Sequence, residues 1–192
     1  MKQMCLKKRL KRFMTLAGAF LIGGLLANGS INAGEVEIGP GSINGDISLI
    51  FEAAPADTVF PSFMHLPEDE TEVHLEVRAN FEENNRYASA AGGFVPYLNV
   101  NAFIKNRATG EALQITLTPH LNLVDSFHYA RNIDLPGDPV NDSYDLTFFV
   151  DPAGLFQVQI HADFRINLGG SIIESQEFTF ENVNFAEVFN GA

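Results

Sequence analysis

Four of the five histidines lie in or beside segments whose sequence is typical of β-strands: His74, His120, His128 and His161. Imidazole is the commonest protein ligand for borderline divalent metals. Glu76 follows His74, and Asp163 follows His161, at the next position on the same face of an extended strand, about 6–7 Å away along the backbone. Such pairs can reach one ion or two neighbouring ions. The sequence therefore indicates a metal site, although short patterns of this kind also occur on ordinary polar faces.

The other features around the histidines are more ambiguous. His120 and His128 bracket the segment 121–127, which either closes over a site or is an ordinary loop. His65 stands in a turn-rich stretch with no same-face carboxylate, and it is predicted to be a surface residue. Its neighbour Met64 is predicted to serve packing rather than metal binding, because a flexible thioether fills gaps well.

No familiar enzyme motif accompanies the histidines. The sequence contains no GxSxG, HExxH, Walker or dinucleotide-binding glycine pattern. Its 24 acidic residues always allow a carboxylate pair, but nothing singles one out for glycoside hydrolysis. No motif therefore supports catalysis, and binding is the stronger interpretation.

The first 33 residues are predicted to be a signal peptide. A basic start is followed by an apolar stretch over 13–27 and by small residues that suit cleavage after Ala33. The apolar stretch is shorter than the roughly 18–20 residues of a membrane-spanning helix, so an uncut anchor is the weaker alternative. The one cysteine, Cys5, falls in this segment. Thiolate metal sites and disulfides are therefore excluded from the single domain predicted over 34–192.

The predicted domain is strongly acidic. The chain has 12 Lys and Arg against 24 Asp and Glu, a net charge of −12. Six of the basic residues lie in the first twelve positions, so the predicted domain carries about −18. Such a surface repels nucleic acid and attracts cations. It fits a cation binder, and it equally fits an acidic surface that serves solubility.

Alternation with a period of two dominates the predicted domain. The segments 71–81 and 155–166 alternate apolar and polar side chains, which is typical of strands with one buried face. Runs rich in β-branched and aromatic residues predict further strands over 47–51, 97–105, 113–117, 144–150 and 173–180. Turns containing glycine or proline separate them, and no segment shows sustained helical periodicity. We therefore expect an all-β fold, an antiparallel β-sandwich, with an up-and-down barrel as the alternative.

Short motifs follow one another in a characteristic order along this domain. They are residues 34–39 (GEVEIG), 43–45 (ING), 74–76 (HLE), 93–98 (GFVPYL), 118–120 (TPH), 127–133 (FHYARNI), 144–148 (YDLTF) and 161–163 (HAD). Each motif alone is modest, but the ordered series is specific. The chain resembles the periplasmic ferrous-iron-transport protein family, copper-binding proteins that work beside an inner-membrane iron permease.

The resemblance implies a fold, an assembly and a set of ligands. It implies an immunoglobulin-like antiparallel β-sandwich that forms a homodimer, with the metal site at or near the dimer interface. Copper-binding histidines of the family correspond to His74, His128 and His161, and a glutamate associated with the iron-type ion corresponds to Glu76. His120 stands where the family has a methionine ligand, and we expect it to bind the metal in this chain. Imidazole in place of a thioether shifts the preference away from Cu(I), toward Cu(II), Zn(II), Ni(II) or Fe(II).

The function expected from this resemblance is periplasmic binding of a divalent metal in support of high-affinity iron uptake by the permease. Copper is the expected ion, and iron, zinc and manganese are further candidates. Two alternatives stay open: a periplasmic copper or zinc buffer or chaperone without an iron role, and an immunoglobulin-like interaction domain whose histidines are incidental. The expected partners are a second copy of the chain and the permease, and no nucleic acid is expected.

Overall fold

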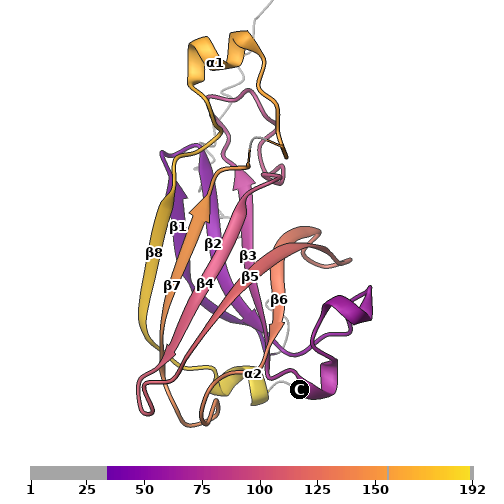
Figure 1. The fold of residues 1–192 in the computed structure, drawn as a ribbon, viewed down its shortest axis with the longest axis vertical. Helices are drawn as coiled ribbons and strands as arrows, with labels where there is room; N and C mark the ends of the chain where they lie inside the picture. Colours follow the sequence, from indigo (N-terminus) through magenta and orange to yellow (C-terminus); the bar gives the residue numbers. More distant parts are fainter. Residues whose placement is uncertain (1–33, 155, 191–192) are drawn as a thin grey trace, which may run out of the picture. The chain divides into compact units, whose positions relative to one another are not determined.

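Eight β-strands form the framework of the computed structural model, which describes residues 34–154 and 156–190 (Figure 1). They are β1 (Val36–Ile43), β2 (Ile47–Ala54), β3 (Val73–Phe81), β4 (Asn99–Asn106), β5 (Ala112–Leu121), β6 (Phe127–Ile133), β7 (Tyr144–Asp151) and β8 (Gln176–Val183). The short helices α1 (Ala162–Leu168) and α2 (Ala186–Asn190) and the 3-10 turns η1 (Ser62–Met64) and η2 (Glu68–Glu70) accompany them. The predicted signal peptide lies outside the described residues. Within those residues, no helix is long and apolar enough to cross a membrane.

The strands form one antiparallel ladder in the order β1-β2-β3-β6-β5-β4-β7-β8. β5 changes its partner along its length, because it pairs with β4 up to Leu117 and with β6 from Thr118 onward. The change divides the ladder into two groups of strands that are joined through β5. It also makes β3, β6 and the second half of β5 neighbours on one surface.

The apolar core lies between the two groups of strands. Phe51 of β2 is fully buried, and its ring centroid lies 4.5 Å from that of Phe148 on β7, in the other group. The rings of Phe178 and Phe180 on β8 lie 5.2 and 5.1 Å from Phe51. These contacts bring β2 close to β8, the last strand of the ladder. A Cβ atom on Gly41 of β1 would lie 2.9 Å from the ring of Phe178, so only glycine leaves room there.

The all-β antiparallel architecture expected from the sequence is confirmed. Two strands, β1 and β6, have no counterpart among the predicted segments. β1 contains two glycines and Pro40, which weaken the strand signal. β6 lies between β3 and β5 and carries polar side chains on one of its faces, among them His128 and Asn132.

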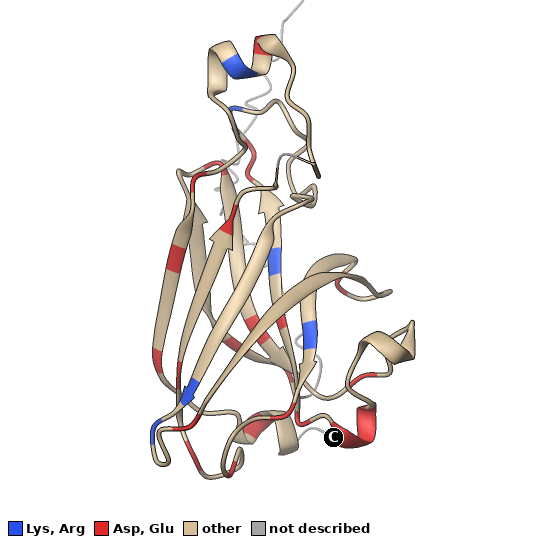
Figure 2. Cartoon of the chain, viewed as in Figure 1, with Lys and Arg blue, Asp and Glu red and all other residues tan. Residues whose placement is uncertain are grey.

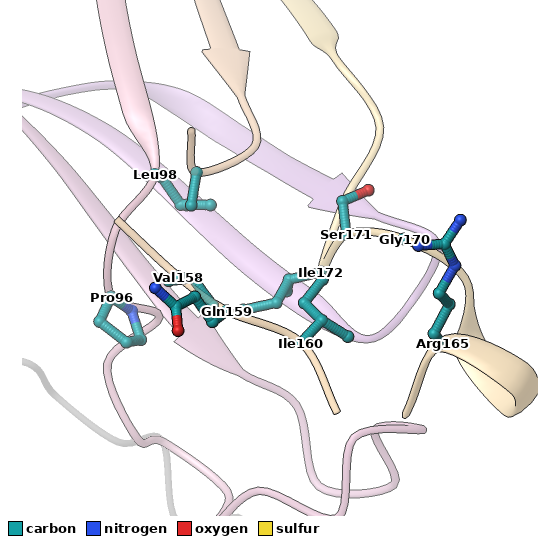
Figure 3. A pocket seen from close by; sticks show the side chains of 10 residues that line it. Pro96, Leu98, Val158, Gln159, Ile160, Arg165, Gly170, Ser171 and Ile172 are labelled. Atoms are coloured by element: carbon teal, nitrogen blue, oxygen red, sulfur yellow. The ribbon is translucent and has the colours of Figure 1, made fainter. Parts of the chain in front are cut away.

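The strand predicted over 155–166 is wrong. The described part of this segment is irregular up to His161 and then forms α1. Val158 and Ile160 line a cavity of about 260 Å³ together with Pro96 and Leu98 (Figure 3). The alternation therefore reflects an extended loop with one side covered, and not the pairing of a strand with a neighbour.

We expect Phe51→Ala to lower the free energy of unfolding by about 3–5 kcal/mol, because it leaves a cavity where rings from three strands meet. Phe149→Ala is the matched control, since Phe149 is 36% exposed on the opposite face of β7, and it should cost far less. Urea unfolding followed by circular dichroism measures both changes. Equal losses would contradict a core centred on Phe51.

Candidate metal centre

Three neighbouring strands carry the candidate ligands. His74 is on β3, His128 is on β6 and His120 is on the second half of β5. His120 lies directly opposite His128 in the β5–β6 pair, and Asn132 lies opposite His74 in the β3–β6 pair. Directly opposite side chains in an antiparallel pair have Cβ atoms about 4.5–5.5 Å apart. Strand pairing itself therefore gathers these side chains on one surface.

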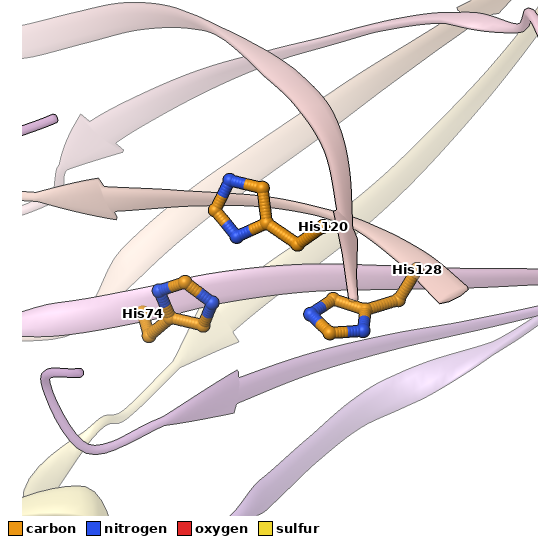
Figure 4. A group of neighbouring side chains, drawn as sticks. All are labelled: His74, His120 and His128. Carbon is orange, nitrogen blue, oxygen red and sulfur yellow. The ribbon is translucent and has the colours of Figure 1, made fainter. Parts of the chain in front are cut away.

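The three imidazole rings converge, as Figure 4 shows. One ligand atom from each of His74, His120 and His128 lies within 4.8 Å of the other two. The ring centroids are 5.2 Å apart for His74 and His120, 5.9 Å for His120 and His128, and 6.2 Å for His74 and His128. Metal–nitrogen bonds are about 2.0–2.1 Å long. Three nitrogens this close reach a common ion after small side-chain rotations.

A buried asparagine determines which nitrogen His74 presents. The amide nitrogen of Asn132 donates to the backbone carbonyls of Asp57 at 2.8 Å and Leu66 at 2.9 Å. The amide oxygen must therefore accept, and it lies 2.5 Å from Nδ1 of His74. His74 consequently carries its proton on Nδ1 and leaves the lone pair of Nε2 free to bind a metal.

The other two rings also have open nitrogens. Nδ1 of His128 donates to the carbonyl of Ser126 at 3.1 Å, which leaves Nε2 available. His120 is half-buried. Its Nδ1 faces the other two rings, and its Nε2 is directed away from them (Figure 4). That Nε2 is shielded from solvent and has no hydrogen-bond partner among residues 34–154 and 156–190. The donor set, three imidazoles with defined or open nitrogens, fits a borderline divalent ion such as Cu(II) or Zn(II).

Burial keeps the three rings neutral. It lowers the pKa of His74 and of His128, and the hydrogen bonds to Asn132 and Ser126 only oppose this effect. Burial, and then the neighbouring rings of the other two histidines, lowers the pKa of His120 to about 3. Because a metal binds neutral imidazole, protons compete for this group only at lower pH than for an ordinary histidine.

Glu76 is a buried carboxyl beside two of the rings. Its side chain is nearly inaccessible, and its Oε1 lies 3.5 Å from Nε2 of His74 and 4.0 Å from Nε2 of His128. Burial, and then the negative charges of nearby carboxylates led by Asp125, raises the pKa of Glu76 to about 8. A cation bound here would favour the ionised carboxylate and so displace this proton.

Two adjoining clefts open onto the group. One, of about 510 Å³, is lined by the three histidines and also by His65 and Arg131. The other, of about 290 Å³, lies on the side of Glu76 and has three further acidic lining residues, Glu35, Asp57 and Asp125. His74 borders both clefts. Figure 2 shows acidic residues spread widely over the described chain and few basic ones, a distribution that attracts cations.

The structure brings together His74, Glu76, His120 and His128, but not His161. His161 is exposed and directly precedes α1. Phe164 of α1 stacks on Tyr87, which follows the C-terminal end of β3, with ring centroids 6.2 Å apart. His74 is near the N-terminal end of the same strand. His161 was expected to join the other histidines because a strand was predicted over 155–166. The described part of that segment forms no strand, and within one chain His161 does not reach the other histidines.

Two further residues belong to the group although the sequence reasoning does not single them out. His65, predicted to be a surface residue, is half-buried instead, and its ring centroid lies 5.1 Å from that of His120. No periodic pattern in the sequence could have predicted that His65 is half-buried, because His65 is in a loop. Asn132 shares a strand face with His128, four residues earlier, and the period-two pattern of β6 would reveal it.

Glu76→Gln should stabilise the metal-free protein increasingly as the pH rises from about 5 to 8. The folded protein keeps a proton on Glu76 up to a pKa of about 8, whereas the ordinary value is 4.5. Between these values the folded state binds more protons than the unfolded state, so its stability falls with rising pH. A glutamine side chain does not ionise in this range, so the variant does not lose this stability. In the wild-type protein the loss is about 1.4 kcal/mol per pH unit.

Urea unfolding of both proteins at several pH values tests this, with Glu111→Gln at an exposed turn as the control. The same pH dependence in wild type and Glu76→Gln would contradict a buried, protonated carboxyl.

Solved structures share the fold. The copper-reconstituted P19 protein of Campylobacter jejuni matches with a TM-score of 0.65 and 26% identity, over 77% of this chain and 94% of that chain. FetP of uropathogenic Escherichia coli strain F11, expressed recombinantly in the periplasm of E. coli, matches with a TM-score of 0.64 and 24% identity, over 77% and 94%. At 24% identity the likeness to FetP establishes the fold alone.

Sequence comparison gives the family. The UPF0423 protein BAB2_0840 of Brucella abortus (strain 2308) is 28% identical over 132 residues, which are 69% of this chain and 69% of that protein. The family model described as Fe2+ transport protein matches residues 32–187. This span contains all eight strands and the four gathered side chains of the candidate metal centre. The chain therefore belongs to the Fe2+ transport protein family.

Proposed function

We propose that the protein binds copper in the periplasm and assists iron uptake. The observation that carries the proposal is the convergence of three neutral imidazoles, those of His74, His120 and His128. Imidazole suits copper, zinc and iron ions. The likeness to copper-reconstituted P19 favours copper over zinc and manganese, and membership of the family favours a role in Fe2+ transport. The signal peptide predicted over residues 1–33 supports the location.

An Fe(II) ion is proposed to bind beside Glu76. Its carboxyl lies between the rings of His74 and His128 and borders the acidic cleft. A site that mixes imidazole with carboxylate suits non-haem Fe(II). Copper held by the three histidines would supply one-electron chemistry next to this position. The contribution of the chain itself is to hold Glu76 at the rings and to release its proton when a cation arrives.

His120 gives the site a preference of its own. The resemblance implies a methionine at this position, and imidazole lacks the soft sulfur that stabilises Cu(I). The group in this chain is therefore proposed to hold Cu(II) more tightly than a site with a thioether would.

The functional unit is proposed to be a homodimer in which His161 of one copy completes the site of the other. Within one chain, His161 is exposed and lies away from the group. Two large apolar side chains near it, Phe156 and Ile166, are 100% and 81% exposed, and Leu123 near the site is fully exposed. Exposed apolar side chains of this kind are typical of interaction surfaces.

Two finer points belong to the same proposal. An inner-membrane iron permease is the proposed recipient of the iron, on the strength of the family description. The immunoglobulin-like form of the sandwich is supported by the two groups of strands that meet at Phe51 and Phe148.

Changing His74 or His128 to alanine should lower the Cu(II) affinity by at least about 100-fold, because loss of a ligand exceeds the 10–100-fold cost of changing an outer partner. Gln114→Ala, at an exposed position of β5, is the control. Competition with a chelator of known affinity measures the effect, and titration of Fe(II) into the copper-loaded protein separates an iron role from a copper or zinc buffer. Absence of copper binding in the wild-type protein would contradict the proposal and favour an interaction domain with incidental histidines.

A mixture of two defective variants tests the role of His161. His161→Ala keeps its own three-histidine group but cannot complete its partner, whereas His74→Ala keeps His161. Each variant alone should bind copper weakly, and the mixture should regain tight binding in part of its sites. Sedimentation measures the dimer in parallel. A monomer, or a mixture no better than its components, would contradict the shared site.

A further inference from the structure

His65 and His120 form a pair on the wall of the larger cleft. Their rings meet edge to face, with centroids 5.1 Å apart. Nδ1 of His65 and Nε2 of His120 are both shielded from solvent, and neither has a hydrogen-bond partner in the described part of the chain. A buried polar atom without a partner costs about 1–3 kcal/mol. Two such nitrogens in neighbouring rings therefore indicate a shared ligand.

The loop that carries His65 is held in place by the fold. His65 directly follows η1, and its backbone nitrogen donates to the carbonyl of Ser62 at 3.3 Å. The next residue, Leu66, accepts the hydrogen bond from the buried amide of Asn132. The same amide orients His74. His65 is thus positioned by the same interaction that positions the three-histidine group.

His120 can serve two ions at once. Figure 4 shows one of its ring nitrogens directed toward His74 and His128, and the other directed away from them. Only an imidazole that stands between two positions presents nitrogens to both. His74 and His128 each use their second nitrogen in a hydrogen bond, to Asn132 and to Ser126, so neither can play this part.

The surroundings of the pair suit a copper ion. The cleft is also lined by Asp57 and Arg131, one acidic and one basic residue. Met64 lines it too and is 53% exposed, so a thioether is within the same space. Imidazole and thioether are ligands for copper rather than for magnesium or calcium.

We propose that His65 and His120 hold a second copper ion at the mouth of the cleft, with the ring of His120 shared between this ion and the one bound by the three histidines. The inference rests on the proposed function in one respect, the copper ion at the three-histidine group. A ring that binds an ion through each nitrogen has lost its N–H proton. Loading both positions therefore releases that proton to solvent, with no change in the oxidation state of copper.

The test is a titration of the purified protein with Cu(II), combined with electron paramagnetic resonance. The wild-type protein should bind two copper ions per chain at these positions. Its signal should correspond to fewer than two unpaired spins per chain, because a shared imidazole couples the two ions. His65→Ala should keep the tight copper ion, lose the second one and give the full signal of one isolated Cu(II). Phe63→Ala is the control, since Phe63 lies in the same turn, is 86% exposed and does not line the cleft.

The outcomes separate this inference from the proposed function. His65→Ala with the copper stoichiometry and signal of the wild-type protein would overturn the second position and leave the three-histidine site standing. Weakened binding of the first copper ion in His65→Ala would equally overturn it, because His65 would then be a ligand of that ion. A wild-type protein that binds no copper would contradict the proposed function itself. Circular dichroism establishes that each variant is folded.

Discussion

One buried side-chain amide connects the candidate metal centre to the rest of the fold. Asn132 donates to the carbonyls of Asp57 and Leu66 and accepts from Nδ1 of His74. It can satisfy all three bonds in one orientation only, so the loop before β3, the strand β6 and the tautomer of His74 are determined together. Asn132 is 4% exposed, and in such a low-dielectric place an unpaired group is costly. The position of His65 in the loop follows from the same constraint.

Burial of this surface has opposite effects on its bases and its acid. It lowers the pKa values of the three histidines, which leaves them as neutral ligands. It raises the pKa of Glu76, which leaves that side chain protonated and uncharged. The metal-free centre is therefore electrically neutral within an acidic protein. A cation changes this balance, because it binds the neutral rings and makes the ionised form of Glu76 favourable.

A periodic pattern predicts secondary structure correctly where only one kind of element can produce it. The prediction fails where a paired strand and a partly covered loop produce the same pattern. The alternation over 71–81 corresponds to β3, a strand with both neighbours in the ladder. The same alternation over 155–166 belongs to an irregular segment and the start of α1, where Val158 and Ile160 cover a cavity beside Pro96. Alternation of apolar and polar residues indicates that one side of a segment is buried. It does not indicate whether that segment is a strand paired with a neighbour.

The sequence by itself determined the ingredients of this protein: an acidic, all-β chain with a single cysteine near its N-terminus, histidines in its strands, and the ordered motifs of an iron-transport family. Only the tertiary structure decided which histidines meet. It gathered His74, His120 and His128, left His161 at the end of a loop and added His65. The physical reason is that the side-chain types and the local period are properties of the sequence. The neighbour of each strand and the path of each loop depend instead on distant contacts, such as the pairing of β3 with β6 and the hydrogen bonds of Asn132.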